Sequence, residues 1–235
     1  MIIIPARIGS TRFPKKVLYE IDGLPMVIST AKRVEDIDEV VIATDDEEVM
    51  ETAKRYGFKA VLTNPRHKSG TDRVNEAATL LGLGERDIVI NVQADEPFIE
   101  KSVVKAVYEL TKKHQDSDDI MINSAYKKLP YPDKNSENIV KVVTTHCDHA
   151  LYFSRSLIPY NRGECDHIKI HLGIYGYTKK MVQRFCALEN APLEDIEKLE
   201  QLRALYHGYK IAMCPVKSDS IGIDTLEDLV RLGLK

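Results

Sequence analysis

Four cationic side chains crowd into one loop directly after the first apolar run of the chain, MIIIP (1–5). Guanidinium and ammonium groups, together with loop amides and hydroxyls, are the groups that bind phosphate oxygens in proteins. Prolines before and within the loop restrict its backbone. The pattern predicts a phosphate-binding loop, although a solvated basic loop would have the same composition. The polar residues of this loop are Arg7, Ser10, Thr11, Arg12, Lys15 and Lys16.

A second group of candidate residues is acidic. In NVQADEP (91–97), Asp95 and Glu96 come directly after a β-branched apolar run, and Asp224 lies in GIDT (222–225). A hard cation such as Mg²⁺ is held by one or two carboxylates together with phosphate oxygens and water. Asp95 is therefore a candidate magnesium ligand. An acidic turn that caps the next helix explains Glu96 equally well, and the sequence alone favours a helix N-cap for Asp224.

The first half of the chain alternates predicted strands and helices. Short β-branched runs predict strands at 1–5, 39–45, 59–63 and 87–97. Capped stretches between them predict helices at 25–35, 46–56 and 71–82. This order predicts a mostly parallel sheet with right-handed crossovers, in which ligands bind beyond the carboxyl ends of the strands. The polar loops expected to gather along that edge are 6–16, 44–46, 64–73 and 93–97.

The second half has a different pattern. Strand-like runs follow one another with connections too short for crossover helices, and HCDH (146–149) fits a hairpin turn between two of them. These runs lie at 119–127, 138–144, 150–155 and 167–178. One helix is expected over 190–208, then a strand at 210–216 and a final helix capped by Asp224 or Thr225. We therefore expect one α/β domain with an antiparallel elaboration after residue 118.

Composition limits the classes of function. The 235 residues include 33 lysines and arginines against 36 aspartates and glutamates, a net charge of −3, so no overall field recruits nucleic acid. No apolar run reaches the roughly 20 residues that span a bilayer, and the N-terminus lacks the pattern of a signal peptide. We therefore expect a cytoplasmic protein without membrane insertion. Its 4 cysteines show no CxxC spacing and are expected to be free thiols.

Other ligand-binding motifs are absent or weak in the sequence. Neither GxxxxGK[ST] nor a GxGxxG after the first strand is present, so the P-loop and dinucleotide motifs lack their glycines. HCDH (146–149) and CDH (165–167) lack the paired spacing of structural zinc sites. A glycosyltransferase of similar fold would use a DxD motif, which ADEP (94–97) does not match. From the residues alone, a dehydrogenase and a flavodoxin-like binder stay open. A non-catalytic binding module would be expected to lack Lys16, Asp95 or Asp224, and all three are present.

The segments together resemble one family over essentially the whole chain. This family is the CMP-Kdo synthetases, cytidylyltransferases that activate 3-deoxy-manno-octulosonate (Kdo). The segments that carry the resemblance follow in the family's order: IPARIGSTRFPKK (4–16), ATDDEEV (43–49), HKSGTDR (67–73), NVQADEP (91–97), ALYFSRSLIPYNR (150–162), HLGIYGYT (171–178), PLEDIEKLEQLR (192–203) and GIDTLEDL (222–229). It implies a nucleotide-diphospho-sugar transferase-like fold, with CTP and Kdo as substrates and CMP-Kdo for lipopolysaccharide biosynthesis as product.

The resemblance also implies a role for each residue at a matching position. The implied CTP-binding residues are Ala6, Arg7, Ser10, Thr11, Arg12, Lys16, Ser69, Gly70, Arg73 and Gln93. The implied sugar-acid residues are Gln93, Arg155, Arg162, His171, Tyr175, Glu200 and Gln201. Asp95 and Asp224 are the implied Mg²⁺ ligands. The implied catalytic residues are Arg12, Lys16, Asp95 and Asp224.

The organisation implied by the resemblance is a single domain over 1–235 that assembles as a homodimer. Residues 1–118 would bind mainly CTP, 119–210 would bind the sugar acid and form the dimer, and 211–235 would add a return strand and helix. Lys15 and Ala94 depart from the family pattern, which usually has glycine at both positions. A related sugar acid, such as 8-amino-Kdo or a sialic acid, stays an alternative to Kdo.

Overall fold

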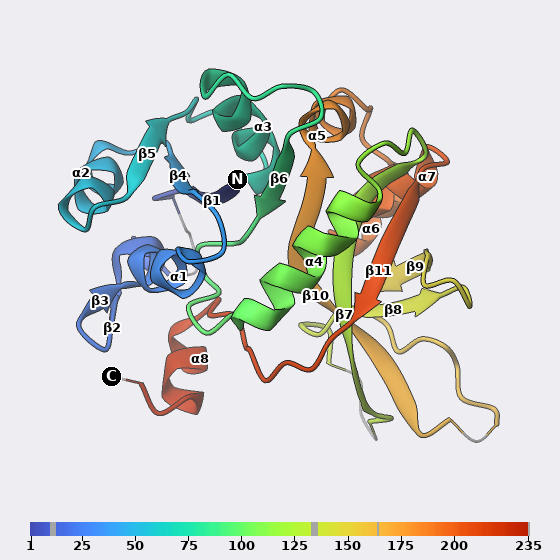
Figure 1. The fold of residues 1–235 in the computed structure, drawn as a ribbon. Coiled ribbons are helices and arrows are strands. Elements are labelled where there is room, and N and C mark those ends of the chain that lie inside the picture. Colours follow the sequence, from blue (N-terminus) through green and yellow to red (C-terminus); the bar gives the residue numbers. More distant parts are fainter. Residues whose placement is uncertain (10–12, 133–135, 164, 235) are drawn as a thin grey trace.

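The structure is a computed structural model that describes residues 1–9, 13–132, 136–163 and 165–234. Its main sheet has the strand order β11-β7-β10-β6-β1-β4-β5, with β8 and β9 attached beside β10 (Figure 1). Helices cover both faces of this sheet. The mixed α/β class expected from the sequence is confirmed, with the parallel part in the first half and the antiparallel part in the second.

The first half forms the expected parallel sheet. β1 pairs in parallel with β4 and β6, and β4 pairs in parallel with β5. The strands are β1 (Ile2–Ala6), β4 (Val40–Thr44), β5 (Lys59–Leu62) and β6 (Ile88–Asn91). The helices are α1 (Met26–Val34), α2 (Glu47–Arg55) and α3 (Gly70–Leu80). The expected strand 87–97 is shorter than predicted, because after β6 the polar residues turn away as a loop at the carboxyl edge.

A small substructure follows the basic loop. It consists of the 3-10 helix η1 (Lys16–Leu18) and the two-stranded sheet of β2 (Glu20–Ile21) and β3 (Leu24–Pro25). These elements were not expected, because two-residue strands are too short to give a pattern in the sequence. They matter because η1 begins at Lys16, one of the candidate catalytic residues.

The parallel strands are buried on both faces, which explains their continuous apolar runs. Ile2 and Ile4 of β1 lie in one core cluster with side chains of α1 and α4 (Lys101–Lys113). Ile3, between them, lies in a second cluster with Val74 and Ala77 of α3. Successive side chains of a strand point to opposite faces, so β1 joins the two helical layers into one core.

The second half carries the antiparallel elaboration. β10 (His167–Thr178) pairs antiparallel with β6 and β7 (Ile120–Pro130), and β8 (Lys141–Thr144) pairs antiparallel with β9 (Ala150–Ser154). The turn expected at HCDH joins β8 to β9, with Asp148 in a left-handed conformation at φ 54°. β11 (Lys210–Pro215) pairs in parallel with β7 at the edge of the sheet.

The prediction of a single helix over 190–208 is wrong. The segment forms two short helices, α6 (Pro192–Glu197) and α7 (Leu202–Tyr206). Lys198 between them has φ 53°, a left-handed conformation that ends a helix. Leu199 and Gln201 are buried at this break, so tertiary packing overrides a sequence that is rich in helix-favouring residues. The break also brings Glu200 into the protein interior, as described below.

Two further helices were not expected. α4 lies across the face of the sheet formed by β10, β7 and β11 (Figure 1), where Val103, Val104 and Val107 are buried. α5 (Lys179–Cys186) follows β10 directly and packs against α3 and β10. None of the helices among the described residues is long and apolar enough to cross a membrane.

The final helix, α8 (Leu226–Arg231), is capped by Thr225 and not by Asp224. Thr225 Oγ1 accepts a hydrogen bond from the Asp228 amide at 3.3 Å, and the Asp228 carboxylate accepts one from the Thr225 amide at 2.9 Å. This capping box fixes the start of the helix. Leu229 of α8 packs with Phe13 and Met26, which holds the C-terminal segment against the region of the basic loop.

Candidate active site

A cavity of about 300 Å³ lies at the carboxyl ends of β1 and β6. Loops from four parts of the sequence meet there, as the topology predicts for a parallel sheet. Its lining residues are Pro5, Arg7, Lys16, Val17, His67, Lys68, Ser69, Gly70, Arg73, Gln93, Ala94, Asp95 and Asp224. Ser10, Thr11 and Arg12, which were also expected here, lie outside the described residues. The cavity thus combines cationic and acidic side chains within one polar site.

Lys16 joins the two acidic residues of the cavity. Its Nζ lies 2.6 Å from Asp95 Oδ2 and 3.1 Å from Asp224 Oδ1. Burial opposes the charge of this ammonium, but the attraction of the two carboxylates outweighs it and raises the pKa of Lys16. Two aspartates that lie far apart in the chain therefore converge on one positively charged group.

The segment 216–224 between β11 and α8, which we call the strap, carries Asp224 to the cavity. The Glu100 carboxylate accepts hydrogen bonds from Ser218 Oγ at 2.7 Å, the Asp219 amide at 2.8 Å and the Ser220 amide at 3.2 Å. Lys127 Nζ donates to the carbonyls of Ser218 at 3.1 Å and Ser220 at 3.3 Å. The strap has no regular secondary structure, so these side chains supply the partners that its backbone needs.

Glu96 lies beneath the strap and does not cap the next helix. Its carboxylate accepts a hydrogen bond from Ser220 Oγ at 3.0 Å, and a Cβ atom on Gly222 would lie 2.8 Å from Glu96 Oε1. The strap therefore needs glycine at residue 222 to pass this carboxyl group. Burial, and next the charge of Asp95, raise the pKa of Glu96 to about 7. One residue further along, the Ile223 amide donates to the carbonyl of Asp95 at 2.9 Å, which aligns the two candidate metal-binding segments.

The carboxylates of Asp95 and Asp224 have the donor chemistry that suits Mg²⁺. Among the described residues, no group of three or more His, Cys, Asp or Glu side chains could hold a metal ion. Mg²⁺ commonly binds one or two carboxylates and completes its coordination with phosphate oxygens and water. The pair therefore fits a cation that shares its ligands between the protein and a bound nucleotide.

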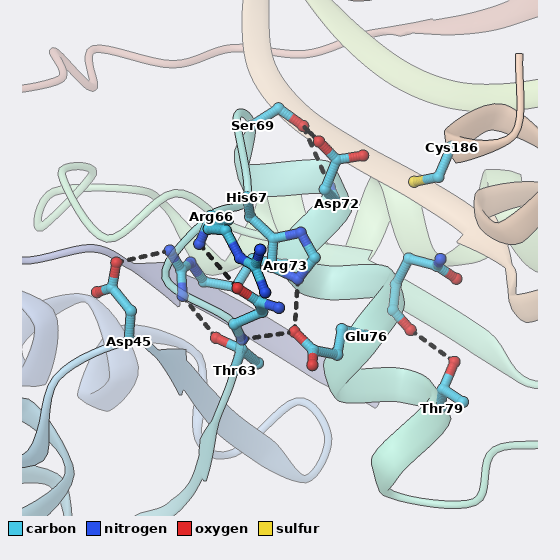
Figure 2. Close-up of polar contacts among 12 residues, drawn as sticks. Asp45, Thr63, Arg66, His67, Ser69, Asp72, Arg73, Glu76, Thr79 and Cys186 are labelled. Atoms are coloured by element: carbon cyan, nitrogen blue, oxygen red, sulfur yellow. Dashed lines mark hydrogen bonds and ion pairs between the residues drawn. The ribbon is translucent and has the colours of Figure 1, made fainter.

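Arg73 lines the cavity, but its guanidinium is held by other side chains of the protein. Its Nη2 lies 2.9 Å from Asp45 Oδ2, and its Nη1 donates to Thr63 Oγ1 at 2.5 Å. Figure 2 draws both contacts as dashed lines. The Arg73 and Asp45 side chains are only 3% and 12% exposed. Asp45 Oδ1 also accepts from the amide of Ile8 at 3.3 Å, so this ion pair ties α3 to the start of the basic loop. Whether Arg73 also contacts a nucleotide stays a prediction.

Ser69, Gly70 and Gln93 form a second wall of the cavity. Ser69 caps α3 by accepting a hydrogen bond from the Asp72 amide at 3.1 Å (Figure 2). A Cβ atom on Gly70 would lie 3.3 Å from Gln93 Oε1, so glycine permits a close approach of the two segments. Gln93 Nε2 donates to Asn91 Oδ1 at 2.8 Å, which fixes the orientation of the Gln93 amide.

Lys15 and Ala94, the two residues that depart from the family pattern, each have a definite place in the structure. Lys15 has φ 54°, in the left-handed region that glycine adopts without cost, and its ammonium pairs with Glu48 of α2 at 2.6 Å. Lys15 therefore anchors the end of the basic loop outside the cavity. Ala94 lines the cavity as a buried methyl group. Ala6, one of the expected CTP-binding residues, packs its methyl group in the core, so only its backbone can face a nucleotide.

Four of the predicted sugar-binding residues lie together beside the cavity. Tyr175 OH donates to Gln201 Oε1 at 3.4 Å, its ring lies 5.5 Å from that of His171, and Glu200 Oε2 accepts from Thr71 Oγ1 at 2.7 Å. Burial raises the pKa of Glu200 and that of Tyr175. Three buried polar atoms here have no hydrogen-bond partner among the residues that the structure describes: Asn91 Nδ2, Glu200 Oε1 and Gln201 Nε2. Buried polar groups are normally paired, so these atoms are available to a polar ligand.

The two predicted sugar-binding arginines lie elsewhere. Arg155 donates from Nε to the carbonyl of Glu197 at 2.8 Å and from Nη1 to that of Glu137 at 2.8 Å. Its amide donates to the Glu197 carboxylate at 2.9 Å, so Arg155 supports the segment that leads to Glu200. Arg162 is exposed in the loop before β10. Direct contact of either arginine with a sugar acid stays a prediction.

His67 and Lys68 line the cavity, although they were not among the predicted site residues. His67 Nε2 lies 2.5 Å from Glu76 Oε2 of α3, a contact drawn in Figure 2. Both residues belong to the segment HKSGTDR, which the sequence already placed at the ligand edge. The loop could be located from the topology, but which of its side chains face inward depends on its backbone path.

The protonation of His171 leads to a prediction about stability. The single hydrogen of Ser124 Oγ can be donated to the carbonyl of Ile174 at 2.8 Å, which leaves the oxygen to accept from His171 Nε2 at 3.1 Å. Burial lowers the pKa of His171 to about 3, while an unfolded histidine titrates near 6.5. As the pH falls below about 6.5, only the unfolded state gains this proton. The free energy of unfolding should therefore fall by up to ~1.4 kcal/mol per pH unit from this residue.

This loss is measured by urea unfolding at pH 7.0, 6.0 and 5.0 for the wild type and His171→Gln. The variant should be less stable at pH 7 and should lose less stability on acidification than the wild type. His146→Gln, which alters an exposed histidine, should keep the wild-type slope. Equal slopes for the wild type and His171→Gln would show that His171 titrates with the same pKa in the folded and the unfolded protein, which would contradict the prediction.

Comparison with known proteins gives a consistent result. The profile of the cytidylyltransferase family matches residues 1–211. A 3-deoxy-manno-octulosonate cytidylyltransferase from a species of Nitratiruptor is 66% identical over 99% of this chain and 98% of its own length. One from Wolinella succinogenes is 48% identical, with 98% and 97% covered. The solved structure of a CMP:2-keto-3-deoxy-manno-octonic acid synthetase complexed with CTP is 36% identical, with a TM-score of 0.88 over 98% of this chain and 95% of that one.

Proposed function

Since this chain belongs to the cytidylyltransferase family, we propose that it transfers the CMP group of CTP to Kdo and releases pyrophosphate. The relatives that cover nearly the whole chain carry this activity in their names. The structural observation that carries the proposal is the cavity at the ends of β1 and β6, which brings Arg7 and Lys16 together with Asp95 and Asp224. Such a site suits a triphosphate, because it offers cations for the phosphates and carboxylates for a metal.

The proposed reaction is a single in-line displacement. The anomeric hydroxyl oxygen of Kdo attacks the α-phosphorus of CTP, the bond from that phosphorus to the bridging oxygen breaks, and pyrophosphate leaves. The hydroxyl proton is lost to solvent, and no covalent enzyme intermediate is required. Arg7 and Lys16 would bind the triphosphate and offset negative charge on the leaving pyrophosphate. Arg12, which lies outside the described residues, is proposed for the same role.

We propose Mg²⁺ as the cofactor, held by Asp95 and Asp224. When bound, it would supply positive charge that polarises the α-phosphoryl group and lowers the pKa of the attacking hydroxyl. The protein residues position the cation and the sugar acid. Asp95 and Asp224 orient the cation, while His171, Tyr175, Glu200 and Gln201 would hold the sugar acid beside the cavity through their buried polar atoms.

We propose that the protein acts in the cytoplasm, in lipopolysaccharide biosynthesis, and as a homodimer. The homodimer is supported by large apolar side chains exposed on the antiparallel half, such as Leu151 (60%), Tyr160 (83%) and Ile196 (76%). Light scattering of the purified protein tests this point, and a monomer mass at micromolar concentration would contradict it.

A coupled assay of pyrophosphate release tests the proposed activity. We expect release that requires CTP, Kdo and Mg²⁺ together, and that is slower by at least about tenfold with 8-amino-Kdo or a sialic acid, because the sugar pocket holds fixed polar partners. Faster pyrophosphate release with either analogue than with Kdo would identify that analogue as the preferred substrate. Release of sugar from a sugar nucleotide, without consumption of CTP, would instead indicate a glycosyltransferase.

A further inference from the structure

Lys16 occupies an unusual electrostatic position for a residue that is expected to bind phosphate. Its Nζ donates to Asp95 Oδ2 at 2.6 Å and to Asp224 Oδ1 at 3.1 Å, so it directly bonds both carboxylates that suit a metal. Its side chain is only 10% exposed, while those of Asp95 and Asp224 are 31% and 57% exposed. The ammonium is therefore the inner partner of the carboxylate pair, and solvent reaches the pair from the other side.

A divalent cation bound by these carboxylates would lie next to the ammonium, because the ammonium is within hydrogen-bond distance of both. Cations at such separations repel strongly, and burial weakens the screening by water. The ammonium also uses one oxygen of each carboxylate that the cation would otherwise bind. Lys16 and a divalent cation thus compete for the same negative charge.

We propose that Lys16 opposes binding of a divalent cation to Asp95 and Asp224, and that triphosphate relieves this opposition by attracting the ammonium. That the triphosphate is CTP rests on the proposed function. Metal affinity and nucleotide affinity are then coupled, since each ligand favours the arrangement in which Lys16 has left the carboxylates. The same lysine would neutralise the carboxylate pair before substrate binds and contact phosphate afterwards.

The competition predicts an effect opposite to that expected for a supporting residue. In protein without nucleotide, Lys16→Met should bind Mn²⁺ at least about tenfold more tightly than the wild type, because the variant loses the repelling charge. Mn²⁺ is a spectroscopic substitute for Mg²⁺, and its free concentration is measured by electron paramagnetic resonance. In the pyrophosphate assay the same variant should be slower, because it lacks the phosphate contact.

Lys15→Met is the matched control, because it removes the same charge from the adjacent residue, whose ammonium pairs with Glu48. Its Mn²⁺ affinity should stay within about twofold of the wild type. Adding Asp95→Asn to Lys16→Met should abolish the gain in Mn²⁺ affinity. This result would show that the additional Mn²⁺ binds at the carboxylates of Asp95 and Asp224. Lys16→Gln provides a second uncharged side chain if the methionine variant does not fold.

Unchanged or weaker Mn²⁺ binding by both Lys16 variants would overturn the proposal and make Lys16 a structural support of the carboxylates. An equal gain in Lys15→Met would also overturn it, since net charge would then explain the effect. The titration contains neither CTP nor Kdo. It therefore fails or succeeds independently of the pyrophosphate assay that tests the proposed function.

Discussion

Replacing Asp95 or Asp224 by asparagine should lower the rate of pyrophosphate release at least ~100-fold at saturating CTP, Kdo and Mg²⁺. The amide keeps the shape of the side chain but removes the negative charge that both Lys16 and a cation require. The loss should appear in kcat, because charge develops on the phosphoryl group during the reaction. Steady-state kinetics of each variant over a range of Mg²⁺ concentrations measures it.

Asp219→Asn is the matched control for Asp224→Asn. Asp219 lies on the same strap, is exposed and does not line the cavity, and its amide rather than its side chain bonds Glu100. Its turnover should stay within about twofold of the wild type, as for most surface substitutions. Urea unfolding of all variants separates loss of chemistry from loss of fold. Near-normal turnover in Asp95→Asn or Asp224→Asn would remove that residue from the proposed metal site.

The strands could be predicted from the sequence because strands buried on both faces give continuous β-branched runs. β1 and β4, whose residues are all buried, lie where such runs predict them. The segment 190–208 could not be predicted, because its residues favour one helix while burial of Leu199 and Gln201 requires a break. That conflict between local propensity and packing occurs where Glu200 enters the site, which is typical of functional segments.

The part of the candidate site that could be predicted is the part that follows from the topology of the parallel sheet. Parallel strands deliver their following loops to one edge, so Arg7, Ser69, Gln93 and Asp95 could be placed near one another, and the cavity contains them all. Asp224 required the family resemblance, because a residue ahead of a capped helix is usually structural. The partners of each charge could not be read from spacing, since Lys16 pairs with residues 79 and 208 positions away.

The partners of Arg73 could not be predicted from the spacing of residues in the sequence either. Its substitution should cause a large loss of stability. Arg73→Met leaves Asp45 without its ion-pair partner in a site where the carboxylate is only 12% exposed. Removing one partner of a buried pair typically costs about 3–5 kcal/mol, because the remaining charge is poorly solvated. We expect a decrease of this size in the free energy of unfolding, measured by urea at pH 7. The Asp45 contact to the Ile8 amide would weaken as well, so the basic loop should lose part of its anchor.

Arg86→Met is the matched control, because Arg86 pairs with Asp116 at the surface, where the two side chains are 71% and 76% exposed. Exposed pairs contribute little, so that variant should lie within about 1 kcal/mol of the wild type. The double variant Arg73→Met with Asp45→Leu should recover part of the lost stability, since it leaves no buried charge unpaired. If Arg73 served mainly to bind CTP, Arg73→Met would instead raise the KM for CTP and leave the unfolding curve unchanged. The internal bonds to Asp45 and Thr63 favour the first outcome, in which Arg73 acts on the nucleotide site by holding α3 against the ends of β4 and β5.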